Sequence, residues 1–180
     1  MEENEILPIV DKDGKVIGKA TRKACHQHKN LIHPVIHCWI FNGKGQILLQ
    51  KRAMTKKIKP GYWDISCGGH VLYGETCEYA LLRELEEEIG VQKANPLLFK
   101  TELQFFSQQT EFVSIYYAII DQPLHYFTMQ IDEVDDLQWI DREIIETESG
   151  NNDLLITQSI RSEVIEIFKS GAYSQLSTLH

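Results

Sequence analysis

Blocks of apolar residues along the chain predict a series of short strands separated by turns and helices. Residues 33–41 are apolar at nearly every position, which is typical of a strand inside a sheet that is covered on both faces. A turn over residues 42–45 leads into a second strand at 46–52, and further strands are predicted at 97–101, 111–120 and 133–140. Residues 6–17 predict a hairpin, because Asp13-Gly14 separates two short apolar runs.

Two segments have the apolar spacing of amphipathic helices. Residues 76–89 predict a helix that begins at the N-cap Thr76 and ends at Gly90. Its expected buried stripe consists of Leu81, Leu82, Leu85 and Ile89. Residues 154–168 predict a second helix, whose stripe consists of Ile156, Ile160, Val164, Ile167 and Phe168.

Mixed strands with helices on both sides indicate an α/β fold of the α/β/α sandwich type, with an N-terminal hairpin as an extension. We expect residues 1–30 to form this hairpin and a short connection packed on the domain. Residues 31–168 would form the domain itself, and residues 169–180 a C-terminal tail.

Composition narrows the classes of function. The 180 residues are 43% hydrophobic, and no apolar run approaches the roughly 20 residues of a membrane span, so we expect no membrane segment. A net charge of -8 argues against binding to a nucleic-acid polymer. The acidic start lacks the pattern of a secretory signal, and the four cysteines contain no Cys-x-x-Cys pair. A cytoplasmic protein with reduced thiols is therefore expected.

The second half of the first helix contains an unusual glutamate cluster. Glu84, Glu87 and Glu88 lie at positions i, i+3 and i+4, hence on one surface of the helix. Two carboxylates about 4 Å apart repel each other by roughly 4 kcal/mol at an effective dielectric of 20. A divalent cation such as Mg²⁺, or alternatively Mn²⁺, would turn this repulsion into attraction. The other interpretation of such a charge run is a solvated acidic helix face.

The residues before this helix fit a phosphate and metal site. The paired glycines Gly68 and Gly69 allow a close backbone approach, so the carbonyl group of Gly68 could reach a metal held by the glutamates. Arg52 and Lys56 belong to the only dense cationic stretch, 51–57, and are candidates for binding diphosphate oxygens. A solvated basic loop is the alternative.

The spacing from Gly69 to Val91 forms a longer pattern. Gly69, five residues, Glu75, seven residues, and then Arg83-Glu84-Leu85-Glu86-Glu87-Glu88-Ile89-Gly90-Val91 match the Nudix box at all nine constrained positions over 23 residues. The chain therefore resembles the Nudix hydrolases. The resemblance implies their α/β/α fold, a divalent metal bound by Glu84, Glu87 and Glu88, and a small substrate that contains a diphosphate.

Outside the box the chain is similar to the branch around type I isopentenyl-diphosphate isomerase, through residues 39–46, 52–57, 60–63 and 69–70. This resemblance implies a second metal site at His26, His33 and His70. It also implies that Arg22, Arg52 and Lys56 bind the diphosphate and that Glu111 corresponds to a catalytic glutamate.

Two departures from the isomerase pattern bear on the reaction. The catalytic cysteine of the isomerase corresponds here to Gly68, and Cys67 lies one residue out of register, so its side chain should point the other way. A metal-binding glutamate of that enzyme falls on Gln109. The complete glutamate set of the box instead favours hydrolysis.

We therefore expect a Mg²⁺-dependent hydrolase that cleaves a diphosphate linkage in a nucleoside diphosphate or a nucleoside diphosphate-linked compound by attack of water at phosphorus. Candidate proton acceptors are Glu84, Glu87 and Glu111, and Arg83 is expected to pair with Glu87 at i,i+4. An isomerase-like enzyme and a non-catalytic nucleotide-binding module remain alternatives. A homodimer that pairs through the N-terminal hairpin is also left open, as is the substrate within its class.

Overall fold

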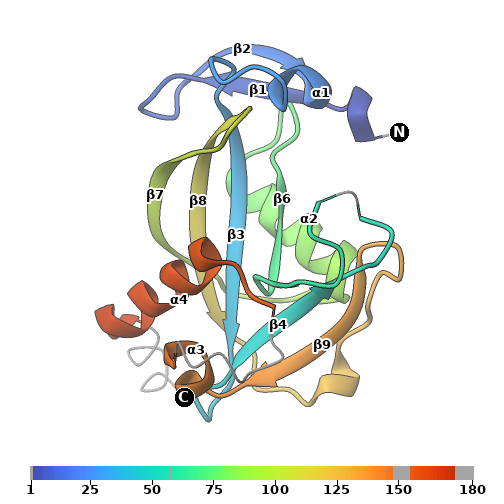
Figure 1. Cartoon of the computed structure of the whole chain (residues 1–180), viewed down its shortest axis with the longest axis vertical. Helices are drawn as coiled ribbons and strands as arrows, with labels where there is room; N and C mark the ends of the chain where they lie inside the picture. Colours follow the sequence, from blue (N-terminus) through green and yellow to red (C-terminus); the bar gives the residue numbers. More distant parts are fainter. Residues whose placement is uncertain (1, 57, 148–154, 173–180) are drawn as a thin grey trace.

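A mixed β-sheet forms the centre of the structure, a computed structural model that describes residues 2–56, 58–147 and 155–172 (Figure 1). Its strands are β3 (His33–Phe41), β4 (Ile47–Arg52), β5 (Trp63–Asp64), β6 (Cys67–His70), β7 (Leu97–Phe105), β8 (Thr110–Ile119) and β9 (Val134–Ile140). The main path has the order β5-β4-β3-β8-β7, while β6 pairs with β3 and β9 pairs with β4. β3 and β8 run parallel and the other pairs are antiparallel, so the sheet is mixed, as predicted.

Two long helices cover opposite faces of this sheet. Alternate residues of β3 point to opposite sides. Ile36 and Cys38 belong to the apolar cluster beneath α2 (Cys77–Ile89), whereas Trp39 and Phe41 pack with residues of α4 (Gln158–Ser170). The α/β/α sandwich is thereby confirmed. The short helices are η1 (Glu2–Asn4), α1 (Arg22–Cys25), η2 (Leu124–Tyr126) and α3 (Arg142–Glu146).

The ends of α2 agree with the sequence-based prediction. The hydroxyl of Thr76 accepts a hydrogen bond from the backbone N–H of Tyr79, and Gly90 adopts the left-handed conformation with φ of 73°. The prediction for Leu82 was wrong, because this side chain is exposed. Glu88 is buried in its place, and the inward face of the helix is therefore centred on Leu81, Leu85 and Glu88.

The predicted N-terminal hairpin is confirmed as a separate two-stranded sheet of β1 (Ile6–Val10) and β2 (Val16–Thr21). It is attached to the domain by backbone hydrogen bonds from Val10 to the carbonyl of Ile32 and from Tyr73 to the carbonyl of Ile6. The hairpin turn also packs on the domain, because a Cβ atom at Gly14 would lie 2.8 Å from the ring of Phe112. This packing holds the first 30 residues close to the end of β3.

Other elements differ in extent from the predictions. β7 continues four residues beyond the predicted 101, because it pairs with β8 up to Phe105. α4 begins at Gln158, and Ile156 lies before it in an isolated bridge to Trp63. The predicted helix start at 154 and the tail residues 173–180 lie outside the described residues. Among the described residues, no helix is long and apolar enough to cross a membrane.

Candidate active site and metal-binding residues

The three box glutamates share one side of α2 but differ in environment. Glu87 is exposed, Glu84 is largely covered, and Glu88 is buried against the sheet. One oxygen of Glu88 accepts hydrogen bonds from the backbone N–H of Gly68 at 3.2 Å and from the Gln50 amide at 3.4 Å. The cluster thus extends from the strands beneath α2 to the solvent.

Arg83 connects this cluster to the preceding loop. Its guanidinium group donates to both oxygens of Glu75 at 3.0 Å, to Glu84 at 2.8 Å and to Glu87 at 3.1 Å. It also donates to the backbone carbonyl of His70 at 3.1 Å. The predicted i,i+4 pair with Glu87 is confirmed. Because one planar group contacts all of these acceptors, it fixes the spacing of the carboxylates.

Burial disfavours the ionised forms of Glu84 and Glu88. Burial, with a smaller contribution from Glu87, raises the pKa of Glu84 to about 7 even though Arg83 opposes the shift. Burial and the charge of Glu84 raise the pKa of Glu88 to about 8. Anionic oxygen ligands packed this closely are the donor set that a hard divalent cation such as Mg²⁺ prefers. The residues therefore fit the predicted metal.

The two glycines of β6 have a steric role in this site. A Cβ atom at Gly69 would lie 2.1 Å from a carboxylate oxygen of Glu84, so only glycine allows Glu84 to lie against the strand. A Cβ atom at Gly68 would lie 2.9 Å from the carbonyl oxygen of Ile36 and 2.3 Å from the side chain of Ile65. The structure gives the Gly68 N–H a partner in Glu88, and the role of the Gly68 carbonyl as a metal ligand stays a prediction.

The predicted phosphate-binding cations already have acidic partners. Arg22 lies 2.9 Å from Glu5, Arg52 lies 3.0 Å from Asp64, and Lys56 is paired with Glu133. Burial is the main cause of the lowered pKa of His70, and the charges of Arg22 and, to the smallest extent, Lys56 add to it. Arg22 lies one helical turn before His26, whereas Arg52 is fixed between Asp64 and the carbonyl of Ile58.

The structure brings together the three histidines that the isomerase resemblance singled out. His26 follows α1, His33 begins β3 and His70 ends β6, yet one nitrogen atom from each ring can be chosen so that all three lie within 4.8 Å of one another. The rings of His33 and His70 are stacked at 5.4 Å between centroids, and the Nε2 atoms of His26 and His70 are 3.0 Å apart.

His33 is oriented as a metal ligand would be. Its Nδ1 lies 3.1 Å from the backbone carbonyl of Leu31, and because a carbonyl can only accept, Nδ1 carries the hydrogen. Nε2 then holds a lone pair, and it is buried without a hydrogen-bond partner among the described residues. Burial lowers the pKa of His33 to about 4 and also lowers those of His26 and His70, so the imidazoles are neutral, which is the form that binds metals.

Glu111 lies next to this group. It pairs in register with His33 across the parallel strands β3 and β8, and its side chain is buried. Burial raises its pKa, while the charge of His37 opposes the shift. One oxygen of Glu111 accepts a hydrogen bond from the amide of Gln109 at 2.5 Å. Gln109 therefore supplies an amide donor at the position where the isomerase pattern has a second carboxylate.

A buried ion pair on the α4 side of the sheet was not predicted from the sequence. His37 of β3 lies 3.0 Å from Glu163 of α4, which also accepts a hydrogen bond from the indole of Trp39 at 2.6 Å. Burial opposes protonation of His37, but the Glu163 carboxylate raises its pKa to about 9. Two signals were available: His37 follows His33 at a spacing of four in a strand, and Glu163 interrupts the apolar stripe of α4.

Known proteins are similar in sequence to most of this chain. A family profile described as NUDIX domain matches residues 31–158. An isopentenyl-diphosphate Delta-isomerase 2 of Photorhabdus laumondii is 34% identical over 142 residues, which cover 76% of this chain and 77% of that protein. An uncharacterized Nudix hydrolase of Listeria monocytogenes is 35% identical over 147 residues, covering 81% and 83% of the two chains.

Among solved structures, the chain is similar to DR0079 from Deinococcus radiodurans. The TM-score is 0.67 at 24% sequence identity, and the alignment covers 78% of this chain and 86% of that one. This similarity shows that the two proteins share a fold. The sequence relatives include proteins named as isomerases and proteins named as hydrolases, so the reaction has to be argued from the residues present here.

Proposed function

Because this chain belongs to the NUDIX domain family, we propose that it is a Mg²⁺-dependent hydrolase. It would cleave the diphosphate linkage of a nucleoside diphosphate or a nucleoside diphosphate-linked compound. The observation that carries this proposal is the cluster of Glu84 and Glu87 on the guanidinium of Arg83, with Glu88 buried beside them on the same helix. Mg²⁺ or Mn²⁺ would supply charge neutralisation at the phosphate oxygens and a more acidic bound water.

The residues of the chain have distinct parts in this proposal. Arg83 holds Glu84 and Glu87 in place, and Gly69 provides the space in which Glu84 lies. A carboxylate must accept the proton of the attacking water, and Glu84, Glu87 and Glu111 are the candidates. Arg22, Arg52 and Lys56 would exchange their present acidic partners for oxygens of the diphosphate.

The second candidate is an isomerase-like enzyme, and the histidine group is the observation that favours it. We propose that His26, His33 and His70 form a second metal site, since neutral imidazoles suit Zn²⁺ and similar transition metals. Isomerisation of an alkene nevertheless needs an acid and base pair. The position of the isomerase cysteine is Gly68, where a side chain would collide with the carbonyl of Ile36.

Cys67 does not replace that missing cysteine. Its side chain is fully buried in the apolar cluster beneath α2, away from the face that carries Glu111. Burial, together with the charge of Glu88, raises the pKa of the Cys67 thiol well above its ordinary value. A buried protonated thiol is a poor catalyst. These contacts support hydrolysis over isomerisation.

The test is an assay of the purified protein with Mg²⁺ on nucleoside diphosphates, nucleotide sugars, dinucleotides and isopentenyl diphosphate, following both phosphate release and the organic product. Release from one nucleotide class, lost in Glu84→Gln, is the expected result. Isomerised isopentenyl diphosphate without phosphate release would overturn hydrolysis and establish the second candidate. Tight nucleotide binding without turnover in either Mg²⁺ or Mn²⁺ would instead identify a nucleotide-binding module.

Two further parts of the proposal concern assembly and location. β2 is an exposed edge strand that carries the exposed apolar residues Val16 and Ile17, and this supports a homodimer through the hairpin. Light scattering on the wild type and on Ile17→Lys would test it, since the charge should produce a monomer. Cys25, Cys38, Cys67 and Cys77 are free thiols, which supports a cytoplasmic location.

A further inference from the structure

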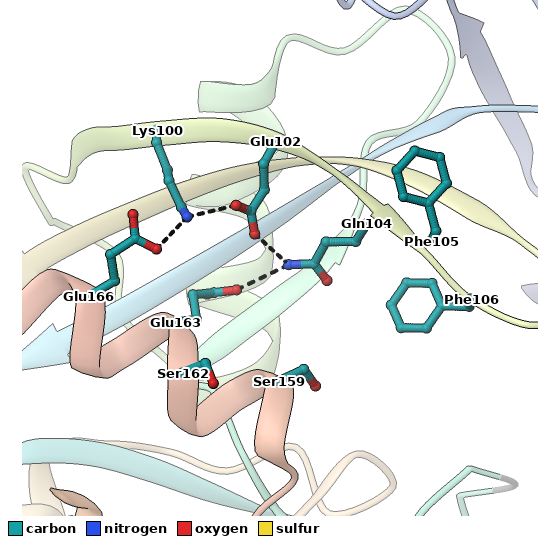
Figure 2. A pocket seen from close by; sticks show the side chains of 9 residues that line it. All are labelled: Lys100, Glu102, Gln104, Phe105, Phe106, Ser159, Ser162, Glu163 and Glu166. Atoms are coloured by element: carbon teal, nitrogen blue, oxygen red, sulfur yellow. Dashed lines mark hydrogen bonds and ion pairs between the residues drawn. The ribbon is translucent and has the colours of Figure 1, made fainter.

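A groove lies between β7 and α4 on the sheet face opposite the box helix (Figure 2). Its volume is about 410 Å³, which is within the range of roughly 300–1,000 Å³ that small-molecule sites occupy. Gln104 and Phe106 line it from β7 and the following turn, and Glu163 lines it from α4. The groove is large enough for a flat organic group.

The side chain of Gln104 presents a fixed acceptor to this groove. Its amide nitrogen donates to Glu102 at 3.0 Å and to Glu163 at 3.3 Å, and because carboxylates only accept, the nitrogen and oxygen positions are defined by chemistry. Figure 2 shows the amide oxygen pointing away from both carboxylates. No hydrogen bond to this oxygen is seen among residues 2–56, 58–147 and 155–172.

Aromatic rings lie at the end of the groove that Gln104 faces. Phe106 is 41% exposed and Phe105 is 74% exposed, and in the view of Figure 2 both rings appear on the side of Gln104 away from Glu163. Phe106 follows Gln104 by two residues in extended backbone, since its N–H bonds to the carbonyl of Gln109, and the two side chains therefore share a face. An exposed ring beside a fixed polar group is suited to stacking a planar heterocycle.

The groove lies on the same sheet face as Glu111 and His33. Gln104 pairs in register with Glu111, which in turn pairs with His33 of the histidine group. On the other side, Glu163 binds His37, and His37 pairs in register with Gly68, whose N–H contacts Glu88. A ligand in the groove can therefore extend a phosphate chain along this face toward Glu111 and the histidine group.

We propose that this groove binds the base of a nucleotide substrate and selects a base that carries an exocyclic amino group. The ring would stack on Phe106, and the amino group would donate to the amide oxygen of Gln104. Glu102, Glu163 and Glu166 outnumber the single cation Lys100 around the groove, and a carbonyl oxygen in place of the amino group would face the acceptor oxygen of Gln104. This inference rests on the proposed nucleotide substrate and assigns the part of the site that recognises its base.

Nucleoside monophosphates test the groove separately from catalysis, because they have no diphosphate linkage to cleave. We would measure the binding of AMP, IMP, CMP, UMP and ribose 5-phosphate by calorimetry to the full chain in Mg²⁺. AMP should bind more tightly than IMP, and CMP more tightly than UMP, if the amino group is recognised. The nucleotide that binds most tightly should bind more tightly than ribose 5-phosphate by about fivefold or more. This is the usual contribution of one stacked base.

Variants of Phe106 test the stacking contact. Phe106→Ala should lower the affinity for the preferred base about fivefold or more and leave ribose 5-phosphate unchanged, while Phe106→Tyr should retain the affinity. Leu98→Ala is the matched control, since Leu98 is an exposed residue of the same strand whose register partner Tyr116 faces α2. Equal binding of nucleotides and ribose 5-phosphate, or tighter binding of IMP and UMP, would overturn the proposal.

The outcomes for groove and reaction are distinguishable. A base preference that depends on Phe106 but occurs in a protein without turnover would support the groove and refute the proposed hydrolysis. Turnover of nucleoside diphosphates with the same rate for every base, unaffected in Phe106→Ala, would support hydrolysis and refute the groove as the base site.

Discussion

The two faces of the central sheet hold reactive residues in different ways. On the α2 side, Glu84, Glu87 and Glu88 belong to one helix and are spaced by its geometry. On the α4 side, His26, His33 and His70 come from three separate segments, and Glu163 reaches His37 from a helix more than a hundred residues later. A local constellation can be recognised from spacing alone, whereas an assembled one requires the strand register.

The faces also differ in charge. Glu84 and Glu87 bind Arg83 whereas Glu88 binds the Gly68 N–H, so one cation faces three carboxyl groups, and burial raises the pKa values of Glu84 and Glu88. His26, His33 and His70 are neutral, and the opposite charges of the buried pair of His37 and Glu163 cancel. The α2 side thus has an excess of acidic groups around Arg83, whereas the histidine group and the pair of His37 and Glu163 carry no net charge. The following predictions test this difference.

The largest effect is expected from removing one box carboxylate. Glu87→Gln and Glu84→Gln should each lower Mg²⁺-dependent turnover by about a thousandfold, because each change removes an anionic ligand or the proton acceptor. Steady-state rates over a range of Mg²⁺ concentrations measure this loss. Glu86→Gln is the matched control, since Glu86 is an exposed neighbour that contacts only Gln92 among the described side chains. A turnover in Glu87→Gln equal to that of the control would refute the α2 metal site.

The second effect concerns stability on the α4 side. His37 has a folded pKa of about 9, above the ordinary value of 6.5, so its pairing with Glu163 stabilises the fold fully below pH 6.5. This contribution should be lost as the pH rises from 6.5 to 9, by up to about 3 kcal/mol. The pKa of Glu163 is lowered by His37 although burial opposes this, so the same pairing also weakens as the pH falls below 4.5.

Urea unfolding between pH 6 and 9 measures this dependence in the wild type and in Glu163→Gln. The variant should be less stable at pH 6 and should have a flatter profile, because its His37 no longer gains a proton on folding. Glu166→Gln, a change on the exposed face of the same helix, serves as the control. Parallel profiles for the wild type and Glu163→Gln would contradict the ion pair.

A tenfold to hundredfold loss of activity is expected from Gly69→Ala. The added methyl group would lie 2.1 Å from an oxygen of Glu84 and must displace that carboxylate from its position beside Arg83. Gly18→Ala in β2 is a suitable control, because the nearest atom to its added Cβ is 3.9 Å away. Rates equal in the two variants would mean that the exact position of Glu84 is unimportant.

Local features of the structure could be predicted from the sequence more fully than features that are assembled from distant segments. The helix cap at Thr76, the stop at Gly90, the hairpin and the strands at 33–41 and 133–140 were predicted correctly, because each depends on neighbouring residues. The pair of Arg83 and Glu87 was likewise available from helix spacing.

The errors arose where tertiary contacts decide. Leu82 has the spacing of a buried residue, but Glu88 turns inward to meet the Gly68 N–H and moves the buried stripe away from Leu82. The resemblance singled out the histidines, whereas their approach to one another depends on the pairing of β3 with β6. Glu163 was missed because a glutamate in an apolar stripe is meaningful only once its partner His37 is placed.

The smallest effect on hydrolysis is expected at the histidine group. His33→Ala removes the buried Nε2 lone pair that faces His26 and His70, so binding of Zn²⁺ by the chain should be lost. Hydrolysis in Mg²⁺ should change by no more than about threefold, because the box carboxylates lie on the other face of the sheet and keep their contacts with Arg83. Calorimetric Zn²⁺ titration and the Mg²⁺-dependent rate, measured on the same preparation, separate the two effects. His28→Ala, at an exposed histidine near the group, controls for general loss of a metal-binding side chain. A hundredfold loss of hydrolysis in His33→Ala but not in His28→Ala would show that the two faces form a single catalytic site.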